Sequence, residues 1–390
     1  MKFIHAGDVH LGNPFVGLDR NMPADFQQLV RSATLTAFQK MIQVALTKQV
    51  DFVLFPGDLY HGQRNSPIVQ DQLRTAFLQL QAAQIPVYLS FGNHDFQADQ
   101  QPHLAWPDNV HVFPQAVTTY TLLTKAGLKI GLTGFSYQDQ RQTKSIMADF
   151  PLKDSSYDYQ IGLYHGSLGS AGSNYAAFKL SDLLAKNYDY WALGHIHVRE
   201  VLHEHPYVAY SGNIQGLNAK ETGPKGFYLV EAKNNQLIPD FKAVAPVIWQ
   251  ELAVKQLTEI DDLLSRLNTL QPNQPTLLTI RLQGPLPALI QEAFNSGLLL
   301  DKARQVVSPR LWIVKITLDL SNVMPRGDVN IDDRVWQKAL NQVLQPDNIN
   351  NLLGGDLPVA LREFFLSPAG QATLKQAMQA QLVEEDHHEN

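Results

Sequence analysis

Short apolar runs alternate with segments of helical periodicity in the N-terminal part of the chain. Apolar residues recur every three or four positions in residues 25–49 and again in residues 70–83, which predicts two helices. The apolar runs around them predict strands at residues 2–7, 51–56 and 87–91. A strand–helix–strand–helix–strand order is typical of a sheet that is at least partly parallel and carries helices on its faces.

The pattern changes after residue 110. Shorter β-like runs divided by Gly and Pro occupy residues 110–137, and further strands are predicted at residues 160–164, 190–193, 207–210 and 226–231. We therefore predict one layered α/β domain over residues 1–242. The Pro-containing residues 239–246 are interpreted as a hinge at its end.

Two smaller parts follow the predicted hinge. Strands are predicted at residues 247–252, 276–282 and 311–320, alternating with helices at residues 257–270 and 287–296. This set predicts a small α+β domain over residues 243–325. Helical spacing at residues 332–344, 357–365 and 371–383 then predicts a helical C-terminal segment over residues 326–390, which we expect to dock onto another surface.

Composition narrows the class of protein. The chain has 390 residues, of which 44% are hydrophobic, so we expect a globular protein of two or three domains. It has no apolar run of membrane-spanning length and no signal-like N-terminus, so we expect it to be cytoplasmic and without membrane contact. With 31 basic and 37 acidic residues the net charge is -6, which argues against a protein that coats nucleic acid by bulk electrostatics. The absence of cysteine restricts any metal site to nitrogen and oxygen ligands.

Polar side chains follow five of the predicted strands directly, with glycine nearby in every case. Because the carboxyl ends of parallel strands share one edge of a sheet, we expect these side chains to converge on one crevice. The five segments are Gly7-Asp8-Val9-His10, Gly57-Asp58-Leu59-Tyr60-His61, Gly92-Asn93-His94-Asp95, Tyr164-His165-Gly166 and Gly194-His195-Ile196-His197.

These segments offer more metal ligands than one tetrahedral site uses, so we predict a pair of ions. Mixed oxygen and imidazole donors suit Mn, Fe, Zn or similar ions and differ from an all-oxygen calcium site. Two ions about 3.5 to 4 Å apart suit the hydrolysis of phosphoesters. His94 is then left over, and it can serve as a general acid or as a proton donor to the phosphate. His61 can reach the same cleft. The candidate ligands are Asp8, His10, Asp58, Asn93, His165, His195 and His197.

In this order the motifs resemble the calcineurin-like metallophosphoesterases. The forms Gly57-Asp58-Leu59-Tyr60-His61 and Gly194-His195-Ile196-His197 are similar to its nuclease branch, the SbcD-type DNA repair exonucleases. The start of the chain, Phe3 to Phe15, is most similar to the bacterial YhaO subgroup, although Gly12-Asn13-Pro14-Phe15 stands where Asp-Ser-Pro-Phe is expected. The resemblance is strong over about residues 1–240, weak over residues 245–325 and nearly absent beyond them.

The resemblance implies an α/β fold, a layered β-sandwich flanked by helices, in which residues 243–325 form a capping domain that binds DNA. It implies that Asp8, His10, Asp58 and His197 hold one ion and that Asp58, Asn93, His165 and His195 hold the other. Mn²⁺ is the metal that it implies, with Fe, Zn and Mg as alternatives. It also implies that His94 protonates the leaving 3′-oxygen or steadies the phosphate and that His61 is a second catalytic histidine. The partners it implies are DNA, an SMC-like ATPase with long coiled coils, and a second copy of the chain in a homodimer.

Other interpretations stay open on the sequence alone. A small-molecule phosphodiesterase or phosphatase, such as one acting on cyclic nucleotides, has nearly the same motifs, and a scaffold protein could use the metals only to organise its fold. Six loop cations could contact phosphates, or could be ordinary surface charges: Arg64, Arg141, Lys144, Arg199, Lys220 and Lys225. The aromatic residues Tyr60, Phe96 and Tyr137 could stack on a base, but core packing is favoured for each. The apolar stripes of the C-terminal helices, with Leu340, Val343, Leu344, Leu361, Phe364 and Phe365, fit either a coiled-coil partner or the chain's own cap.

Overall fold

A computed structural model gives the fold of residues 1–15, 21–62, 66–96, 105–169, 174–319, 344–345, 348 and 359–375. Internal contacts divide the chain into two compact units, Met1–Val323 and Met324–Asn390. The division at residues 242 and 325 that we predict from the sequence stays a prediction. Within the described ranges, none of the helices has both the length and the apolar character needed to cross a membrane.

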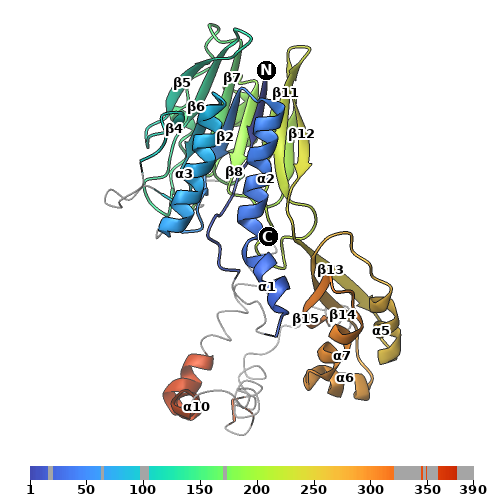
Figure 1. Cartoon of the computed structure of the whole chain (residues 1–390). Helices are drawn as coiled ribbons and strands as arrows, with labels where there is room; N and C mark the ends of the chain where they lie inside the picture. The colour runs from blue at the N-terminus through green and yellow to red at the C-terminus, as the bar shows by residue number, and fades with distance from the viewer. Residues whose placement is uncertain are drawn as a thin grey trace. The chain divides into compact units, whose positions relative to one another are not determined.

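Two six-stranded mixed sheets form the body of the first unit (Figure 1). The first sheet has the order β12-β11-β1-β2-β3-β4 and consists of β1 (Lys2–His5), β2 (Phe52–Pro56), β3 (Val87–Ser90), β4 (Val110–Val112), β11 (Gly226–Lys233) and β12 (Gln236–Ala243). The second has the order β5-β6-β7-β8-β10-β9 and consists of β5 (Thr118–Leu123), β6 (Lys129–Gly134), β7 (Tyr159–His165), β8 (Tyr190–Gly194), β9 (Glu200–Glu204) and β10 (Tyr207–Tyr210). In the first sheet β1 to β4 are parallel, and in the second β6, β7, β8 and β10 are parallel.

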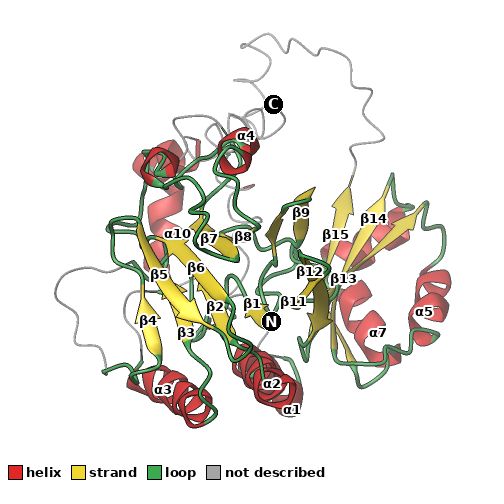
Figure 2. Ribbon diagram, turned by 90° about the horizontal axis from the view of Figure 1, so that it is seen from above, coloured by secondary structure: helices red, strands yellow, loops and turns green. Residues whose placement is uncertain are grey.

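Three apolar layers hold this sandwich together. Alternate residues of the strands face opposite sides, so Phe52 and Leu54 of β2 point between the sheets toward Ile161 and Leu163 of β7. The outer face of the first sheet is covered by the helices α2 (Ala33–Lys48) and α3 (Pro67–Ala82), as Figure 2 shows. The outer face of the second sheet is covered by α4 (Leu180–Leu184) and the loop that contains the short 3₁₀ helix η1 (Met147–Asp149). The predicted layered α/β sandwich flanked by helices is confirmed.

The structure corrects several details of the predicted elements. The helix predicted at residues 25–49 is two helices, α1 (Ala24–Arg31) and α2, which meet at Ser32. The hinge predicted at residues 239–246 is wrong for its first half, because Pro239 lies in β12 opposite Val230 of β11. Proline is tolerated there because β12 is an edge strand and needs no N–H donor on its open side. β9 is a further strand that the sequence pattern did not predict.

A third sheet follows within the first unit. The strands β13 (Ile248–Lys255), β14 (Thr276–Gln283) and β15 (Leu311–Asp319) are all parallel, and the helices α5 (Ile260–Asn268), α6 (Ala288–Asn295) and α7 (Leu298–Val306) connect them. The sequence pattern did not predict α7. Trp249 of β13 and Leu277 of β14 share an apolar cluster with Phe26 and Val30 of α1 and with Leu217. The third sheet is therefore packed directly against a helix and a loop that connect strands of the first two sheets.

In the second unit the described residues include α10 (Val359–Leu366) and a further helical stretch at residues 368–375. They overlap the helices predicted at residues 357–365 and 371–383. The side chains of Leu361 and Phe364 are exposed. Most of the helix predicted at residues 332–344, with Leu340 and Val343, lies outside the described residues.

Candidate metal centre

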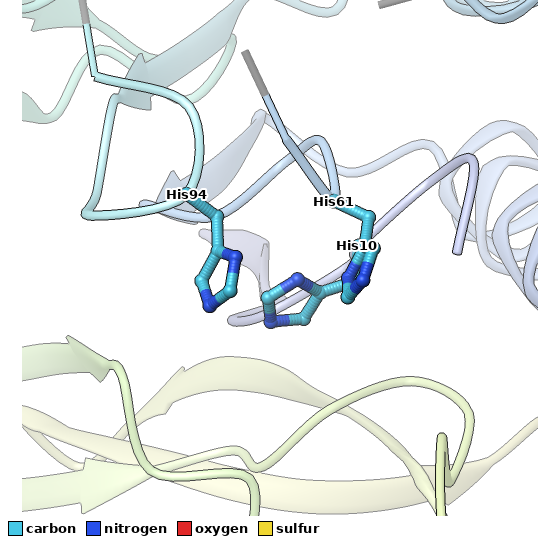
Figure 3. Close-up of side chains that lie close together, drawn as sticks. All are labelled: His10, His61 and His94. Carbon is cyan, nitrogen blue, oxygen red and sulfur yellow. The ribbon is translucent and has the colours of Figure 1, made fainter. Parts of the chain in front are cut away.

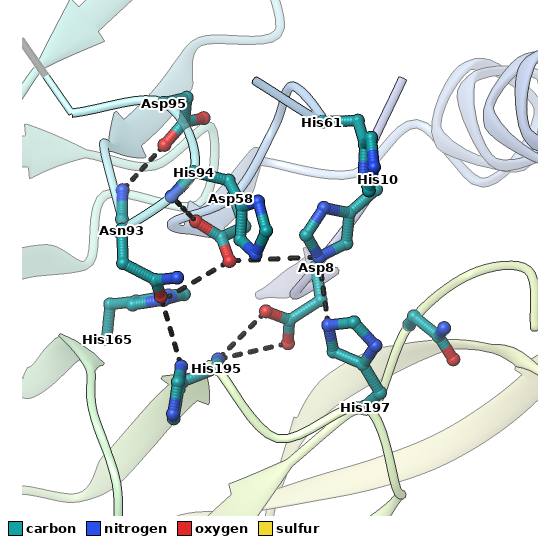
Figure 4. A network of polar contacts seen from close by, with 12 residues as sticks. Asp8, His10, Asp58, His61, Asn93, His94, Asp95, His165, His195 and His197 are labelled. Carbon is teal, nitrogen blue, oxygen red and sulfur yellow. Dashed lines mark hydrogen bonds and ion pairs between the residues drawn. The ribbon is translucent and has the colours of Figure 1, made fainter. Parts of the chain in front are cut away.

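The predicted ligands come from the ends of strands in both sheets of the sandwich. Asp8, Asp58 and Asn93 follow β1, β2 and β3 of the first sheet. His165 ends β7 of the second sheet, and His195 and His197 follow β8. The expectation of a single sheet edge is therefore too simple, because the donors meet where the edges of two sheets face each other. Figure 4 shows that they converge.

Four of these residues have a left-handed backbone conformation. The φ angles are 48° for Asp8, 50° for His10, 50° for Asp58 and 100° for His195. Residues other than glycine rarely adopt such angles, and each costs on the order of 1–3 kcal/mol unless the surroundings enforce it. Strain gathered at one place in this way marks a site whose side-chain directions matter more than local stability.

Hydrogen bonds between the loops hold these strained turns. The N–H of His10 donates to the carbonyl oxygen of Asp58 at 3.0 Å, so the loops after β1 and β2 run side by side. The buried carboxylate of Asp95 accepts from the N–H of Leu59 at 2.6 Å and from that of Gly92 at 2.7 Å. Asp95 thus ties the Asp58 loop to the Asn93 loop. Sequence analysis gave Asp95 no role, although it completes the Gly-Asn-His-Asp motif.

The first group of donors is Asp8, His10 and His197, whose ligand atoms all lie within 4.8 Å of one another. Nε2 of His10 lies 2.9 Å from Nε2 of His197. Two nitrogens bound to adjacent positions of one ion at about 2.1 Å are separated by about 3 Å, so this spacing fits a shared cation. Asp8 is oriented by the N–H of His195, which donates to its two carboxylate oxygens at 2.9 and 3.1 Å.

The second group joins Asp58, Asn93 and His165, with His195 beside them. Nε2 of His165 lies 2.9 Å from Oδ1 of Asn93 and 3.5 Å from Oδ2 of Asp58. Nδ1 of His195 lies 3.1 Å from the same Asn93 oxygen. Oδ2 of Asp58 also lies 3.7 Å from Nε2 of His10, so this carboxylate faces both groups.

The chemistry of these contacts fits a bound cation. Nδ1 of His165 lies 2.9 Å from the carbonyl oxygen of Pro56 and must donate to it, so Nε2 of the neutral ring presents a lone pair. That lone pair points at oxygens that are themselves acceptors. A positive ion satisfies such a set of facing acceptors.

Burial controls the protonation of the donors. Desolvation raises the pKa of Asp8 to about 6. Desolvation also raises the pKa of Asp58 well above its ordinary value, and the nearby carboxylates of Asp95 and Asp8 raise it further. Burial is the largest cause that lowers the pKa of the histidines, and neighbouring imidazoles lower it further. The pKa of His10 and of His165 lies well below 6.5, and that of His195 is about 4. The histidines are therefore neutral at neutral pH, as metal ligands must be.

His197 is the exception among the histidines. Burial lowers the pKa of His197, but a hydrogen bond to Glu221 and the charge of Asp8 outweigh burial and raise it. Glu221 is nearly buried and its Oε1 lies 2.9 Å from Nδ1 of His197. Sequence analysis missed Glu221, because it lies in the loop between β10 and β11, far from any strand-end motif.

His61 and His94 lie beside the donors at the wall of a cleft of about 600 Å³. Their rings are stacked with centroids 5.5 Å apart, and the centroid of His10 lies 5.4 Å from His61 and 4.9 Å from His94 (Figure 3). Phe96, Gln140 and Ser66 also line the cleft. The N–H of His94 donates to Oδ1 of Asp58 at 2.9 Å, which fixes this histidine next to the donors.

Several residues that the sequence suggested as base or phosphate contacts have other surroundings in the structure. Tyr60 and Tyr137 are buried in the core, so neither can stack on a base in a cleft. Lys225 is buried too, and its Nζ donates to the carbonyl oxygen of His197 at 2.8 Å. The guanidinium of Arg199 stacks on Phe241, 4.1 Å from the ring centroid. Arg64, predicted to bind substrate, lies outside the described residues.

Fold and site together define a metal-dependent phosphoesterase. A family model described as calcineurin-like phosphoesterase matches residues 1–199, and the chain belongs to this family, which uses a dinuclear metal site. The site has His and Asp groups suited to such a pair of ions, and the resemblance noted in the sequence is confirmed.

Curated relatives agree with this assignment. The chain is 36% identical to the uncharacterized metallophosphoesterase YhaO of Bacillus subtilis over 75% of this chain and 74% of the relative. It is 24% identical to the DNA double-strand break repair protein Mre11 of Thermoplasma acidophilum over 73% of this chain and 77% of the relative. It is 22% identical to one subunit of the nuclease SbcCD of Staphylococcus saprophyticus over 63% of this chain and 70% of the relative.

Glycine at position 92 leaves room for two donors, which gives a first test. A Cβ there would lie 2.4 Å from Oδ1 of Asp58 and 2.7 Å from Nε2 of His165. We expect Gly92→Ala to weaken Mn²⁺ binding by about 10-fold or more, since overpacking of this kind costs about 1–3 kcal/mol. Gly62→Ala is the matched control, because a Cβ at Gly62 meets nothing within 4 Å. Isothermal titration calorimetry of both variants measures the effect, and equal affinities would contradict the described packing.

The raised pKa of Asp8 gives a second test. Its folded pKa of about 6 exceeds the ordinary value of 3.8, so between these values the metal-free folded protein binds more protons than the unfolded chain. The contribution of Asp8 to stability is then full at low pH and is lost as the pH rises through about 6. A cation displaces the proton, so we expect the increase in melting temperature on adding Mn²⁺ to be larger at about pH 7.5 than at about pH 5.5. Thermal melts with chelator and with Mn²⁺ measure it, and an increase independent of pH would contradict the role of Asp8.

Proposed function

We propose that this protein is a Mn²⁺-dependent nuclease that hydrolyses phosphodiester bonds in DNA during repair, in the cytoplasm. The observation that carries the proposal is the cleft lined by His94 and His61, which lie directly beside the candidate metal donors. This arrangement lets one phosphate contact the donors and an imidazole at the same time. It also leaves space along the cleft for the rest of a substrate.

We assign Asp8, His10, Asp58 and His197 to one ion and Asp58, Asn93, His165 and His195 to the other. The position of Asp58 Oδ2 supports the shared role, because it lies 3.7 Å from Nε2 of His10 and 3.5 Å from Nε2 of His165. When bound, two divalent ions supply an acidified water as nucleophile and neutralise charge on the phosphoryl oxygens. The oxygen and imidazole donors are compatible with Mn²⁺.

His94 is proposed to donate a proton to the leaving 3′-oxygen. Its backbone is held by Asp58, and its ring lies on the cleft side of His10. An alkoxide is a poor leaving group, so a correctly placed proton donor contributes about 10²–10⁴-fold to the rate. His61 is proposed as the second catalytic histidine. Its ring stacks on that of His94, and this contact keeps the His94 ring in place at the cleft wall.

DNA is proposed as the substrate because of the relatives. Mre11 of Thermoplasma acidophilum is named as a DNA double-strand break repair protein, and its similarity covers 73% of this chain. The relative from Staphylococcus saprophyticus is, by its name, one subunit of a nuclease. We therefore also propose an SMC-like ATPase with coiled coils as partner, for which the exposed Leu361 and Phe364 of α10 offer apolar contacts. DNA binding by a capping domain at residues 243–325 and a homodimer stay predictions.

Leaving-group dependence tests the role of His94. We expect His94→Ala to lower Mn²⁺-dependent cleavage of end-labelled duplex and single-stranded DNA by about 10²-fold or more. The same variant should hydrolyse bis-p-nitrophenyl phosphate nearly as fast as the unchanged protein, since nitrophenolate leaves without a proton. His203→Ala is the control, because His203 lies in β9 and its Nδ1 is paired with the carbonyl oxygen of Pro206.

Two outcomes of this experiment separate the alternatives. Equal losses on both esters would show that His94 steadies the phosphate and does not protonate the leaving group. Turnover of the chromogenic ester alone, with all DNA intact even after the ATPase partner is added, would favour a small-molecule phosphodiesterase or phosphatase.

A further inference from the structure

Glu221 is a buried carboxylate whose two oxygens serve different neighbours. Oε1 accepts from Nδ1 of His197 at 2.9 Å and from Nδ2 of Asn218 at 2.6 Å. Oε2 accepts from the N–H of Leu217 at 2.7 Å and from the side-chain amide of Asn213. Glu221 is thus fixed by three donors of its own loop, and the remaining contact is directed at a candidate metal ligand.

The loop that carries Glu221 is itself held from outside. Trp249 of β13 donates its indole N–H to the carbonyl oxygen of Gly216 at 2.9 Å, and its own carbonyl oxygen accepts from the N–H of Gly223 at 2.9 Å. The side-chain amide of Gln215 donates to the carbonyl oxygen of Val247 at 2.8 Å. These bonds anchor both ends of the loop to the start of the third sheet, so the Glu221 carboxylate cannot easily follow a displaced imidazole.

His197 needs such support because it is the least buried donor of its group. Its side chain is 25% exposed, whereas that of His10 is fully buried. Lys225 holds the backbone of His197 through its carbonyl oxygen, but this bond leaves the ring free to rotate. The bond to Glu221 fixes the ring, by placing the proton on Nδ1 and the lone pair of Nε2 toward His10.

We propose that Glu221 is a positioning residue that fixes the tautomer and ring orientation of His197 for one ion of the pair. The inference rests on the proposed metal centre. A carboxylate that accepts from the far nitrogen of a ligating histidine also makes that histidine a stronger donor, and its loss typically lowers metal affinity about 10–100-fold. Because the second group of donors does not include His197, the effect should be confined to one of the two ions.

The test uses the full chain, stripped of metal and titrated with Mn²⁺. Calorimetry and electron paramagnetic resonance count the ions and show whether they are coupled as a pair. For Glu221→Ala we expect one ion to bind about 10–100-fold more weakly while the other is unchanged, with uncoupled Mn²⁺ signals at low occupancy. Glu221→Gln keeps one oxygen that can accept from Nδ1 but turns an NH2 group toward other N–H donors of the loop, so we expect an affinity between those of Glu221→Ala and the unchanged protein. Glu231→Ala is the control, since Glu231 pairs with Lys2 and Lys233 on the surface of β11.

A second readout separates positioning from folding. Nitrogen chemical shifts of the His197 ring in the metal-free protein, recorded at an alkaline pH at which the ring is neutral, report its tautomer, which should be Nδ1–H in the unchanged protein and mixed in Glu221→Ala. The inference is overturned if Glu221→Ala binds both ions normally, if it loses both equally, or if the His197 ring keeps a single Nδ1–H tautomer in Glu221→Ala. Failure of the unchanged protein to bind a pair of ions would instead overturn the proposed metal centre.

Discussion

The burial of carboxylates and imidazoles at a single point sets requirements that the surrounding loops, glycines and sheets have to meet. Asp8 and Asp58 are removed from water, and desolvation raises the pKa of both. A buried charge costs several kcal/mol unless an opposite charge or hydrogen bonds compensate for it. Strained turns and closely placed glycines all serve to bring these acceptors together. A divalent cation turns that costly arrangement into a stable one, and so couples folding of the site to its chemistry.

The sandwich supplies the rigidity that this arrangement needs. One set of donors follows β1, β2 and β3, and the other follows β7 and β8, so the site exists only where two sheets are held face to face. The contact between His165 and the carbonyl oxygen of Pro56 crosses from one sheet to the other. The apolar layer between the sheets, with Phe52 and Ile161 among its members, therefore contributes to the geometry of the donors as well as to stability.

A layer of hydrogen bonds around the donors completes the centre. Asp95 joins two ligand loops, and Glu221 joins the ring of His197 to a loop anchored on β13. Neither carboxylate needs to touch a substrate to matter, because a ligand that can rotate loses affinity for its ion. On the open side, His61 and His94 line the cleft. The candidate donors are thus held by hydrogen bonds on their buried side, and the two histidines beside them are accessible from the cleft.

The parts of the structure that depend on local pattern could be predicted from the order of the amino acids. Apolar periodicity predicted most strands and helices, and polar residues after strands predicted which side chains would meet, since the end of a strand fixes where its next residues lie. The sequence could not show the pairing of Pro239 in β12, because an edge strand carries little periodic signal. It could not show that two sheets share the site, nor single out Asp95 and Glu221, because only tertiary packing brings a buried carboxylate to its partners. Hydrogen bonds between residues distant in sequence produce no regular spacing along the chain, so these contacts could be identified only from the folded structure.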